Sequence, residues 1–241
     1  MRVEVATLAA LGTNAKESLF RLRHRVFKER LDWSVESDDG MELDAFDDGY
    51  ARYVLGSEGS GHVCGCMRLI PTHRPYMLAE VFPELAPGVS LPRDPDIWEM
   101  SRFAFDTEDE GATRWGFSDR ALALIREAVR FAIGRGIARY VLVTTVAVER
   151  MMLRQRLHCH RLGPPRLIGG VRSVALVLEV DQATQQALGI SAECPANWPA
   201  NRAHGGHASI AIAPSGCGVH SNPGDLCSLY GTAACAATPR H

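Results

Sequence analysis

An amphipathic helix that leads directly into a buried strand constrains the fold of this chain more than any other feature. Four apolar side chains of residues 118–134 recur at helical spacing, namely Leu122, Ile125, Val129 and Ile133. Gly134 and Gly136 are typical of a helix end. Residues 140–146 are apolar and rich in β-branched side chains, which predicts a buried strand. This pair of elements predicts helices packed on a sheet.

Helix and strand patterns alternate along most of the chain. Strands are predicted around Val3 and Val5 and at residues 50–56, 62–69, 97–105, 140–146, 167–168 and 171–180. Helices are predicted at residues 18–31, 77–82, 118–134 and 148–157. The alternation predicts one α/β domain, built as a three-layer α-β-α sandwich.

The composition argues against a nucleic-acid-binding or membrane-inserted protein. The net charge is −2, and no apolar run approaches the roughly 18–20 residues of a membrane span. We therefore expect a cytoplasmic protein. After Leu188 the sequence loses its periodicity and becomes rich in Gly, Ala, Ser and Pro, which predicts a folded domain of residues 1–188 and a poorly ordered tail of residues 189–241. The Cys and His spacings match no metal site, and none is predicted.

Residues 32–48 form an acidic stretch without Lys or Arg. Its eight acids are Asp32, Glu36, Asp38, Asp39, Glu42, Asp44, Asp47 and Asp48. One interpretation is a solvated loop. The other is a loop that apolar residues such as Trp33 and Phe46 anchor to the domain, which would create a site for a cation.

Residues 97–105 form a mostly apolar strand that carries charges. Strict alternation places Glu99, Ser101 and Phe103 on one face and Trp98, Met100 and Arg102 on the other. Charges in such a strand need partners or a function. They are either salt-bridged or at a strand end, or Glu99 is a buried carboxylate with a raised pKa that serves as a general base.

A basic segment follows the strand at 140–146. Its arginines are Arg150, Arg154, Arg156, Arg161, Arg166 and Arg172, and its only acid is Glu149. The segment is either a solvated helix face or a docking surface for an acidic partner, such as a carrier protein, or for a phosphate. Nucleic acid is disfavoured because the segment is short and has no interleaved aromatic residues.

Short motifs follow one another in order between residues 21 and 179. They are Arg-His-Arg-Val-Phe at 23–27 with Trp33, Glu-Leu-Asp-Ala-Phe-Asp at 42–47, Arg-Leu-Ile-Pro-Thr at 68–72, Tyr-Met-Leu at 76–78, Val-Phe-Pro at 81–83, Glu-Met-Ser-Arg-Phe at 99–103, Ala-Val-Glu-Arg at 147–150 and Cys-His-Arg-Leu-Gly at 159–163. Each motif is weak alone, but their order and spacing together are specific. In these motifs the chain resembles the LuxI-type acyl-homoserine-lactone synthases, the autoinducer synthases of quorum-sensing bacteria.

The resemblance implies a mixed sheet similar to that of GNAT-type acyltransferases, and an enzyme that needs no cofactor. The amine of S-adenosylmethionine, a substrate, would attack the thioester of an acyl carrier protein or of coenzyme A. The methionine carboxylate would then displace methylthioadenosine and close the lactone. The residues implied on the S-adenosylmethionine side are Arg23, Phe27, Trp33, Asp44, Asp47 and Arg102, with Glu42, Arg68 and Ser101 in support. Glu99 is the leading candidate for the base and Asp47 the second.

The resemblance also assigns an acyl pocket to Phe82, Met100, Leu142 and Thr144, and carrier docking to Arg150, Arg154 and Arg161. Leu142 stands where relatives that make 3-oxo signals often carry a hydroxyl, so an acyl chain without a 3-oxo group is expected. Two rivals are weighed. A generic coenzyme A-dependent N-acyltransferase is disfavoured because no Arg/Gln-x-x-Gly-x-Gly/Ala turn precedes residue 118. A non-catalytic S-adenosylmethionine-binding protein is disfavoured by the presence of Glu99.

Overall fold

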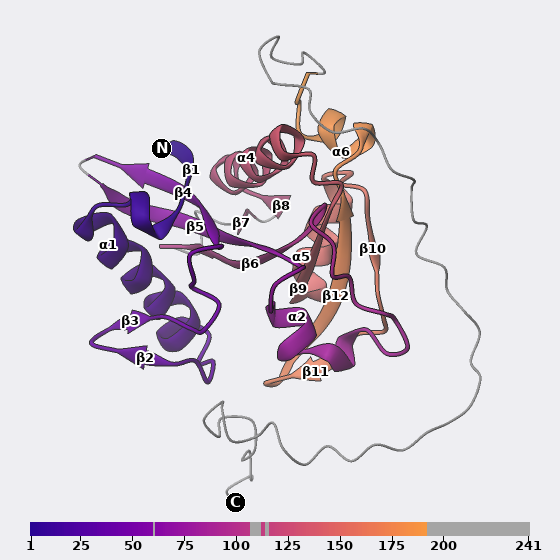
Figure 1. Ribbon diagram of the computed structural model, residues 1–241, viewed down its shortest axis with the longest axis horizontal. Coiled ribbons are helices and arrows are strands. Elements are labelled where there is room, and N and C mark those ends of the chain that lie inside the picture. Colours follow the sequence, from indigo (N-terminus) through magenta and orange to yellow (C-terminus); the bar gives the residue numbers. More distant parts are fainter. Residues whose placement is uncertain (60, 107–111, 114–115, 192–241) are drawn as a thin grey trace, which may run out of the picture. The chain divides into compact units, whose positions relative to one another are not determined.

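An eight-stranded mixed sheet forms the centre of the domain (Figure 1). The computed structural model describes residues 1–59, 61–106, 112–113 and 116–191. In spatial order the strands are β1 (Arg2–Ala6), β4 (Arg52–Glu58), β5 (His62–Pro71), β6 (Ile97–Phe105), β9 (Arg139–Thr145), β12 (Val171–Glu179) and β10 (Cys159–Arg161), with β11 (Arg166–Ile168) paired to β12. Every pair is antiparallel except β6–β9, which is parallel.

Helices cover both faces of this sheet. They are η1 (Leu8–Ala10), α1 (Thr13–Arg23), the π-helix η2 (His24–Arg30), α2 (Met77–Glu80), η3 (Pro83–Leu85), α4 (Asp119–Arg135), α5 (Val146–Arg154) and α6 (Gln182–Ala187). Two short hairpins complete the described elements, β2 (Ser37–Asp38) with β3 (Met41–Glu42), and β7 (Ala112–Thr113) with β8 (Gly116–Phe117). In Figure 1, α1 and the β2–β3 hairpin lie in the half built on β4 and β5, and α2 lies in the half built on β9 and β12.

The buried apolar side chains separate into clusters by sheet face. Met67 and Leu142 pack with α4 and α5 on one face, whereas their neighbours Cys66 and Val141 belong to clusters on the other face, which α1 and α2 cover. Adjacent residues of a strand point to opposite faces, so helices flank the sheet on both sides. The predicted three-layer α-β-α sandwich with a mixed sheet is thereby confirmed.

The predicted elements are present, with shifted ends. The helix α4 matches its prediction closely, because Ser118 caps its first turn by accepting a bond from Ala121 N (3.1 Å) and Gly136 ends it with φ at +71°. The helix predicted at 18–31 begins earlier, at Thr13, and becomes a π-helix at His24. Several short elements were not predicted, among them β10 and α6, since three strand residues or one short polar helix carry no clear periodicity.

The parallel pair β6–β9 separates partway along its length. The two strands pair only from Ile97↔Arg139 to Met100↔Leu142. Beyond this point β6 continues to pair with β5, and β9 with β12. The edges of Ser101–Phe105 and Val143–Thr145 therefore face each other without a shared ladder.

The folded part of the chain extends slightly past the predicted boundary at residue 188. Leu188 is buried, its carbonyl accepts a hydrogen bond from Arg126 Nε (2.8 Å), and Ile190 packs against the core. The predicted tail lies outside the described residues from position 192 onward. Among the described helices, none is both long and apolar enough to cross a membrane.

Candidate active site

A bulge in β6 brings Arg102 to the same face as Glu99 and Ser101. Arg68 pairs with Ser101 and Cys66 pairs with Ala104, so two residues of β6 oppose one residue of β5. Arg102 has a φ of +52°, a conformation that non-glycine residues rarely adopt. The strict alternation predicted for this strand is therefore wrong beyond Ser101, and Phe103 instead packs on the α4 side.

Three guanidinium groups and three carboxylates form one buried ion cluster on this face. Arg23 donates to Glu42 (2.5 Å) and, through two nitrogens, to Asp47 (2.7 and 2.9 Å). Arg68 donates to Asp44 (2.5 and 3.0 Å) and to Asp47 (2.8 Å). Arg102 joins Glu42, the partner of Arg23, to Asp44, the partner of Arg68. It donates to Glu42 (2.9 and 3.1 Å) and to Asp44 (2.7 Å). The charges balance within the cluster, as burial of ions requires.

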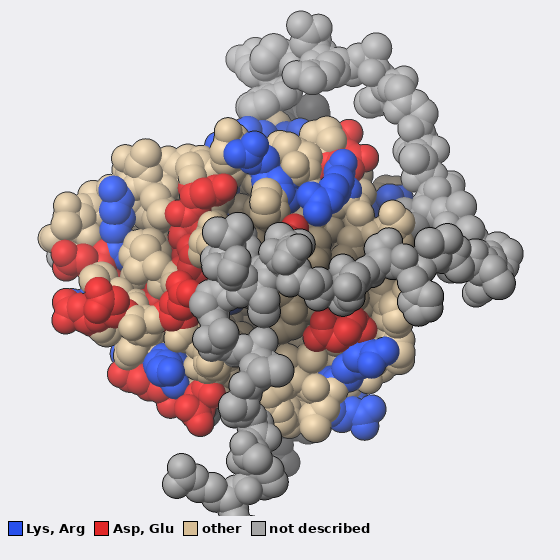
Figure 2. Space-filling model, turned by 60° about the horizontal axis from the view of Figure 1, so that its bottom comes forward, with Lys and Arg blue, Asp and Glu red and all other residues tan. Residues whose placement is uncertain are grey.

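The cluster decides between the two interpretations of the acidic stretch. Arginines from three separate elements, α1, β5 and β6, anchor the second half of the stretch. The side chain of Glu42 is fully buried and that of Asp47 is 1% exposed. The first half is solvated at Asp32, Glu36, Asp38 and Asp39. On the face drawn in Figure 2, most acidic side chains lie over the left half, which carries α1 and the β2–β3 hairpin in Figure 1.

Two aromatic rings lie beside the cluster. Phe27, in the π-helix η2, stacks on Trp33 with ring centroids 5.2 Å apart, and the Arg102 guanidinium lies 5.2 Å from the Phe27 ring. Trp33 N donates to Phe27 O (2.8 Å), which ties the chain after η2 back to the helix. Phe27 is buried, whereas Trp33 is 36% exposed. Trp33 is thus the solvent-exposed member of the pair, and Phe27 is the member that contacts Arg102.

Glu99 is buried beside the cluster and receives two backbone hydrogen bonds. Its carboxylate accepts from Met77 N (3.0 Å) and Leu78 N (2.7 Å) at the start of α2. Burial raises the pKa of Glu99 to about 7, although these bonds and the charges of Arg68 and Arg102 act in the opposite direction. The sulfur of Met77 lies 3.2 Å from nitrogens of both arginines, so one residue contacts Glu99 and the cluster.

Asp47 has the opposite electrostatic environment. Burial alone would raise its pKa, but the charges of Arg68 and Arg23 and the hydrogen bonds from Arg23 and Tyr53 hold the pKa well below its usual value. Tyr53 Oη donates to Asp47 Oδ1 at 2.6 Å, and Asp44 N donates to Oδ2 at 2.9 Å. Asp47 is therefore a permanent anion whose oxygens are already occupied.

Tyr53 and Met77 were missed by sequence reasoning. Tyr53 pairs with Arg68 across β4 and β5, and its hydroxyl reaches the cluster from there. A tyrosine in a predicted strand needs a hydrogen-bond partner for its hydroxyl if it is buried, and this requirement could have indicated Tyr53 from the sequence. Met77 stands in the Tyr-Met-Leu motif, but its contacts could not be predicted because they depend on where α2 docks.

The four residues of the predicted acyl pocket are divided between the sheet faces. Met100 pairs with Leu142, and both belong to the core on the α4 side. Thr144 is half-buried two residues further along the same face. Phe82 packs with Val141 on the opposite face, so an acyl pocket lined by all four residues stays a prediction and would have to pass through the sheet.

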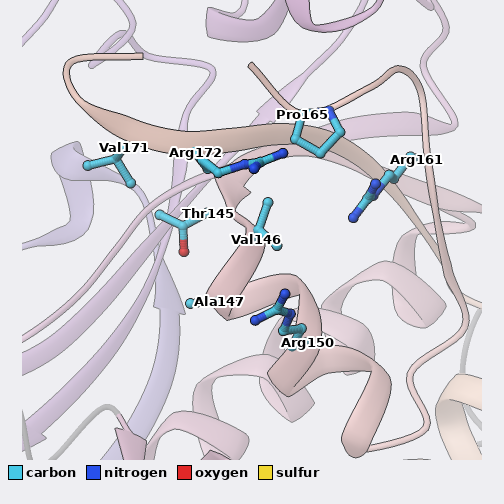
Figure 3. Close-up of a pocket in the computed structure, with 8 residues that line it drawn as sticks. All are labelled: Thr145, Val146, Ala147, Arg150, Arg161, Pro165, Val171 and Arg172. Atoms are coloured by element: carbon cyan, nitrogen blue, oxygen red, sulfur yellow. The ribbon is translucent and has the colours of Figure 1, made fainter. Parts of the chain in front are cut away.

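The predicted docking arginines lie around α5, apart from the cluster. Arg150 and Arg161 line one pocket, which Figure 3 shows in close-up. Arg154 is exposed in the last turn of α5 and is not among the pocket residues. Among the described residues, no group of three or more His, Cys, Asp or Glu side chains is placed to hold a metal ion.

A mixed sheet whose one parallel pair among the described strands, β6–β9, separates partway along its length is typical of a GNAT-like acyltransferase fold. The autoinducer synthase family matches residues 8–188. The chain belongs to this family and is an enzyme of the acyl-homoserine-lactone synthase class. The acyl-homoserine-lactone synthase of Pseudomonas aeruginosa is 43% identical over 172 residues, which cover 70% of this chain and 85% of that protein.

Solved structures agree with this assignment. The structure of the AHL synthase LasI is 41% identical with a TM-score of 0.71, and the match covers 78% of this chain and 93% of that one. BjaI, a CoA-dependent acyl-homoserine lactone synthase solved with SAM and isopentyl-CoA, is 29% identical with a TM-score of 0.69 and coverages of 77% and 85%.

Proposed function

We propose that this enzyme makes N-acyl-homoserine lactones from S-adenosylmethionine and an acyl thioester, and releases methylthioadenosine. The observation that carries the proposal is the position of Glu99, a buried carboxylate with a pKa of about 7, next to the ion cluster and the separated strands. The relative BjaI, solved with SAM and isopentyl-CoA, supports the two substrates.

The ion cluster and the aromatic pair suit S-adenosylmethionine. Among the three carboxylates, Asp44 keeps the most exposed side chain, at 15%, and is the one that can meet the substrate ammonium without leaving its arginines. The exposed ring of Trp33 offers a π-face for the sulfonium. Arg102 contacts both Asp44 and the ring of Phe27, on which Trp33 stacks, and would receive the methionine carboxylate. The remaining cluster residues would keep Asp44 and Arg102 in position through their ion pairs and hydrogen bonds. They are Arg23, Arg68, Glu42 and Asp47, with Ser101 bonded to Arg68.

Glu99 is a better base than Asp47. A group whose pKa lies near neutrality is half ionised at physiological pH and can take a proton, whereas Asp47 is held ionised by its hydrogen bonds and has no free oxygen. Glu99 would accept a proton from the substrate ammonium, directly or through water. The free amine then attacks the thioester carbonyl, the carbon–sulfur bond breaks, and the thiolate leaves and takes up a proton.

The second half of the reaction needs no base. The methionine carboxylate attacks the carbon bonded to the sulfonium, the carbon–sulfur bond breaks, and neutral methylthioadenosine departs with the electron pair. Because the sulfonium is already a good leaving group, positioning of the carboxylate is the main requirement. Arg102 and the aromatic pair would supply that positioning.

The acyl chain would cross the sheet between β6 and β9. Glu99 lies on the face covered by α2, while Met100 and Leu142 lie on the face covered by α4. The strands separate directly after the Met100↔Leu142 pair, so an acyl chain that enters there reaches the apolar core on the far side. The thioester donor, acyl carrier protein or acyl-coenzyme A, would approach from the α5 side, where the exposed arginines lie.

Product analysis tests the proposal. The full chain is incubated with S-adenosylmethionine and matched acyl thioesters of both donor types, and the products are analysed by mass spectrometry. We expect acyl-homoserine lactone and methylthioadenosine in equal amounts. An acylated amine without methylthioadenosine would indicate a generic N-acyltransferase, and no product from any donor would indicate a binding protein.

A further inference from the structure

A cationic pocket lies at the junction of β9, α5 and β12, apart from the ion cluster. It encloses about 510 Å³, a size in the range of small-molecule sites. Six of its residues carry the argument below: Thr145, Val146, Ala147, Arg150, Arg161 and Arg172. Figure 3 shows the guanidinium groups of Arg150, Arg161 and Arg172 arranged around Val146.

The pocket is lined by three arginines and by no carboxylate. Arg161 is held by Glu149 through two hydrogen bonds of 2.5 and 2.7 Å. Within the part of the chain that the structure describes, neither Arg150 nor Arg172 has a hydrogen bond or ion pair. Like charges gathered without a counter-charge repel one another, and an anion would relieve this repulsion.

The start of α5 adds backbone donors to the same pocket. Thr145 is its N-cap and accepts a hydrogen bond from Val148 N (3.2 Å). The amides of Val146 and Ala147 belong to the first turn, which has no intrahelical acceptors. Both residues line the pocket, so the start of the helix, where anions bind favourably, lies at the pocket together with the arginines.

The strand β9 runs from the pocket toward the ion cluster. Thr145 ends that strand, and from Val143 to Thr145 the edge facing β6 carries no ladder partner from it. An extended ligand anchored in the pocket can therefore lie along this edge and pair its amides with the strand backbone. Its far end would reach Ser101 and Arg102, the residues that face the same gap from β6.

We propose that this pocket binds the phosphate of the donor's phosphopantetheine arm, with Arg150 and Arg172 as its main ligands. The inference rests on the proposed function and adds Arg172, which the docking prediction did not include. The arm is common to acyl carrier proteins and coenzyme A, so the pocket recognises what the two donors share. Arg154, outside the pocket, remains available to the surface of a carrier protein.

The test compares donors that differ only in the phosphate. The full chain and its Arg172→Gln variant are assayed with acyl-phosphopantetheine and with acyl-pantetheine of the same acyl chain. We expect kcat/KM for the phosphorylated donor to fall roughly tenfold in the variant, and kcat/KM for the phosphate-free donor to stay unchanged. Arg150→Gln should behave in the same way. Arg166→Gln, an exposed arginine of the same segment outside the pocket, is the matched control and should change neither value.

Three outcomes would overturn the inference. They are an equal loss on both small donors, no loss on acyl-phosphopantetheine, or a loss confined to acyl-coenzyme A. Acyl carrier protein and acyl-coenzyme A are run in parallel, and both should lose efficiency. Binding of free phosphopantetheine, measured by calorimetry on wild type and Arg172→Gln, does not require turnover. It separates a failure of the pocket assignment from a failure to make lactone, which would instead overturn the proposed function.

Discussion

Glu99 shows how burial sets the chemistry of a single residue. Its carboxylate is 1% exposed, and desolvation outweighs both its backbone hydrogen bonds and the nearby arginines. Asp47, in the same part of the fold, is stabilised as an anion by Arg23, Arg68 and Tyr53. The pKa values of these two carboxylates are shifted in opposite directions, and in the proposed mechanism Glu99 is the proton acceptor and Asp47 a structural anion.

The first prediction concerns the substitution Glu99→Gln. It should keep the fold and the binding of S-adenosylmethionine, and lower turnover at least tenfold, about 1.4 kcal/mol of barrier. Steady-state kinetics and calorimetric titration with S-adenosylmethionine measure the two effects. Turnover near the wild-type value would remove Glu99 from the mechanism and leave Asp47 as the base.

The second prediction concerns pH. Because the base must be ionised, kcat/KM should rise as pH increases through about 7 and then level off. This rise should be absent in Glu99→Gln. Stability should move the other way: the folded pKa is raised above the ordinary value of 4.5, so the folded state loses stability as pH rises from about 4.5 to about 7. The pH profiles of kcat/KM and thermal melts over the same pH range, for the wild type and for Glu99→Gln, measure these effects. A variant that keeps the wild-type rise of kcat/KM through pH 7 would contradict the assignment of that rise to Glu99.

The third prediction concerns the acyl chain and Leu142. This side chain is 6% exposed and packs among Met100, Met152 and Leu176, where it offers no hydrogen-bond donor to a 3-oxo group. An unpartnered buried carbonyl costs roughly 1–3 kcal/mol, so unsubstituted thioesters should be preferred. Leu142→Thr should shift selectivity toward 3-oxo thioesters of equal length. A clear 3-oxo preference in the wild type would count against this, and would point to the hydroxyl of Thr144 on the same face.

At the scale of elements, α5 carries two separate basic features. Arg150 and Arg154 are four residues apart and therefore lie on the same side of the helix, but only Arg150 lines the pocket. The helix begins next to the unpaired edge of β9 and ends at the protein surface with the exposed Arg154. Its start therefore lies where the proposed phosphopantetheine arm would bind, and its end lies where a carrier protein would dock.

The fourth prediction follows from this arrangement. Reversal of both Arg150 and Arg154 to Glu should raise the KM for an acyl carrier protein, most strongly at low salt, because screening weakens attraction between opposite charges. Kinetics over a range of ionic strength measure the effect. Little change in the KM for the carrier protein, together with efficient use of acyl-coenzyme A by the wild-type enzyme, would identify coenzyme A thioesters as the donor.

At the scale of the whole molecule, the fifth prediction defines the catalytic domain. The family match ends at residue 188, and the structure adds the packing of Ile190 against the core. Truncation after Ser191 should therefore leave a folded, active enzyme, while truncation after Leu188 should cost some stability by removing Ile190. Thermal melts and turnover of both truncated proteins measure this. Lost activity after the longer cut would show that residues beyond 191 contribute to the enzyme.

The sequence alone determined the class of fold and the family, and its motifs contained all six residues of the ion cluster. Periodicity is a local property, so α4 and β9 could be read directly from their apolar spacing, and Ser118 and Gly136 from their capping chemistry. A family motif can also be recognised from neighbouring residues alone, and such motifs contain Arg23, Asp44 and Glu99. None of this depends on how distant segments meet.

Tertiary structure decided which residues act together. Arg102 shares a face with Glu99 only because a bulge interrupts the alternation of β6. Glu42 and Asp47 are buried anions only because arginines from α1, β5 and β6 converge on them, and no pattern within residues 32–48 records that convergence. That Phe82 lies on the other side of the sheet from Met100 and Leu142 is likewise visible only in the tertiary structure. Contacts between segments far apart in the chain set burial, and burial sets the pKa values on which the proposed chemistry depends.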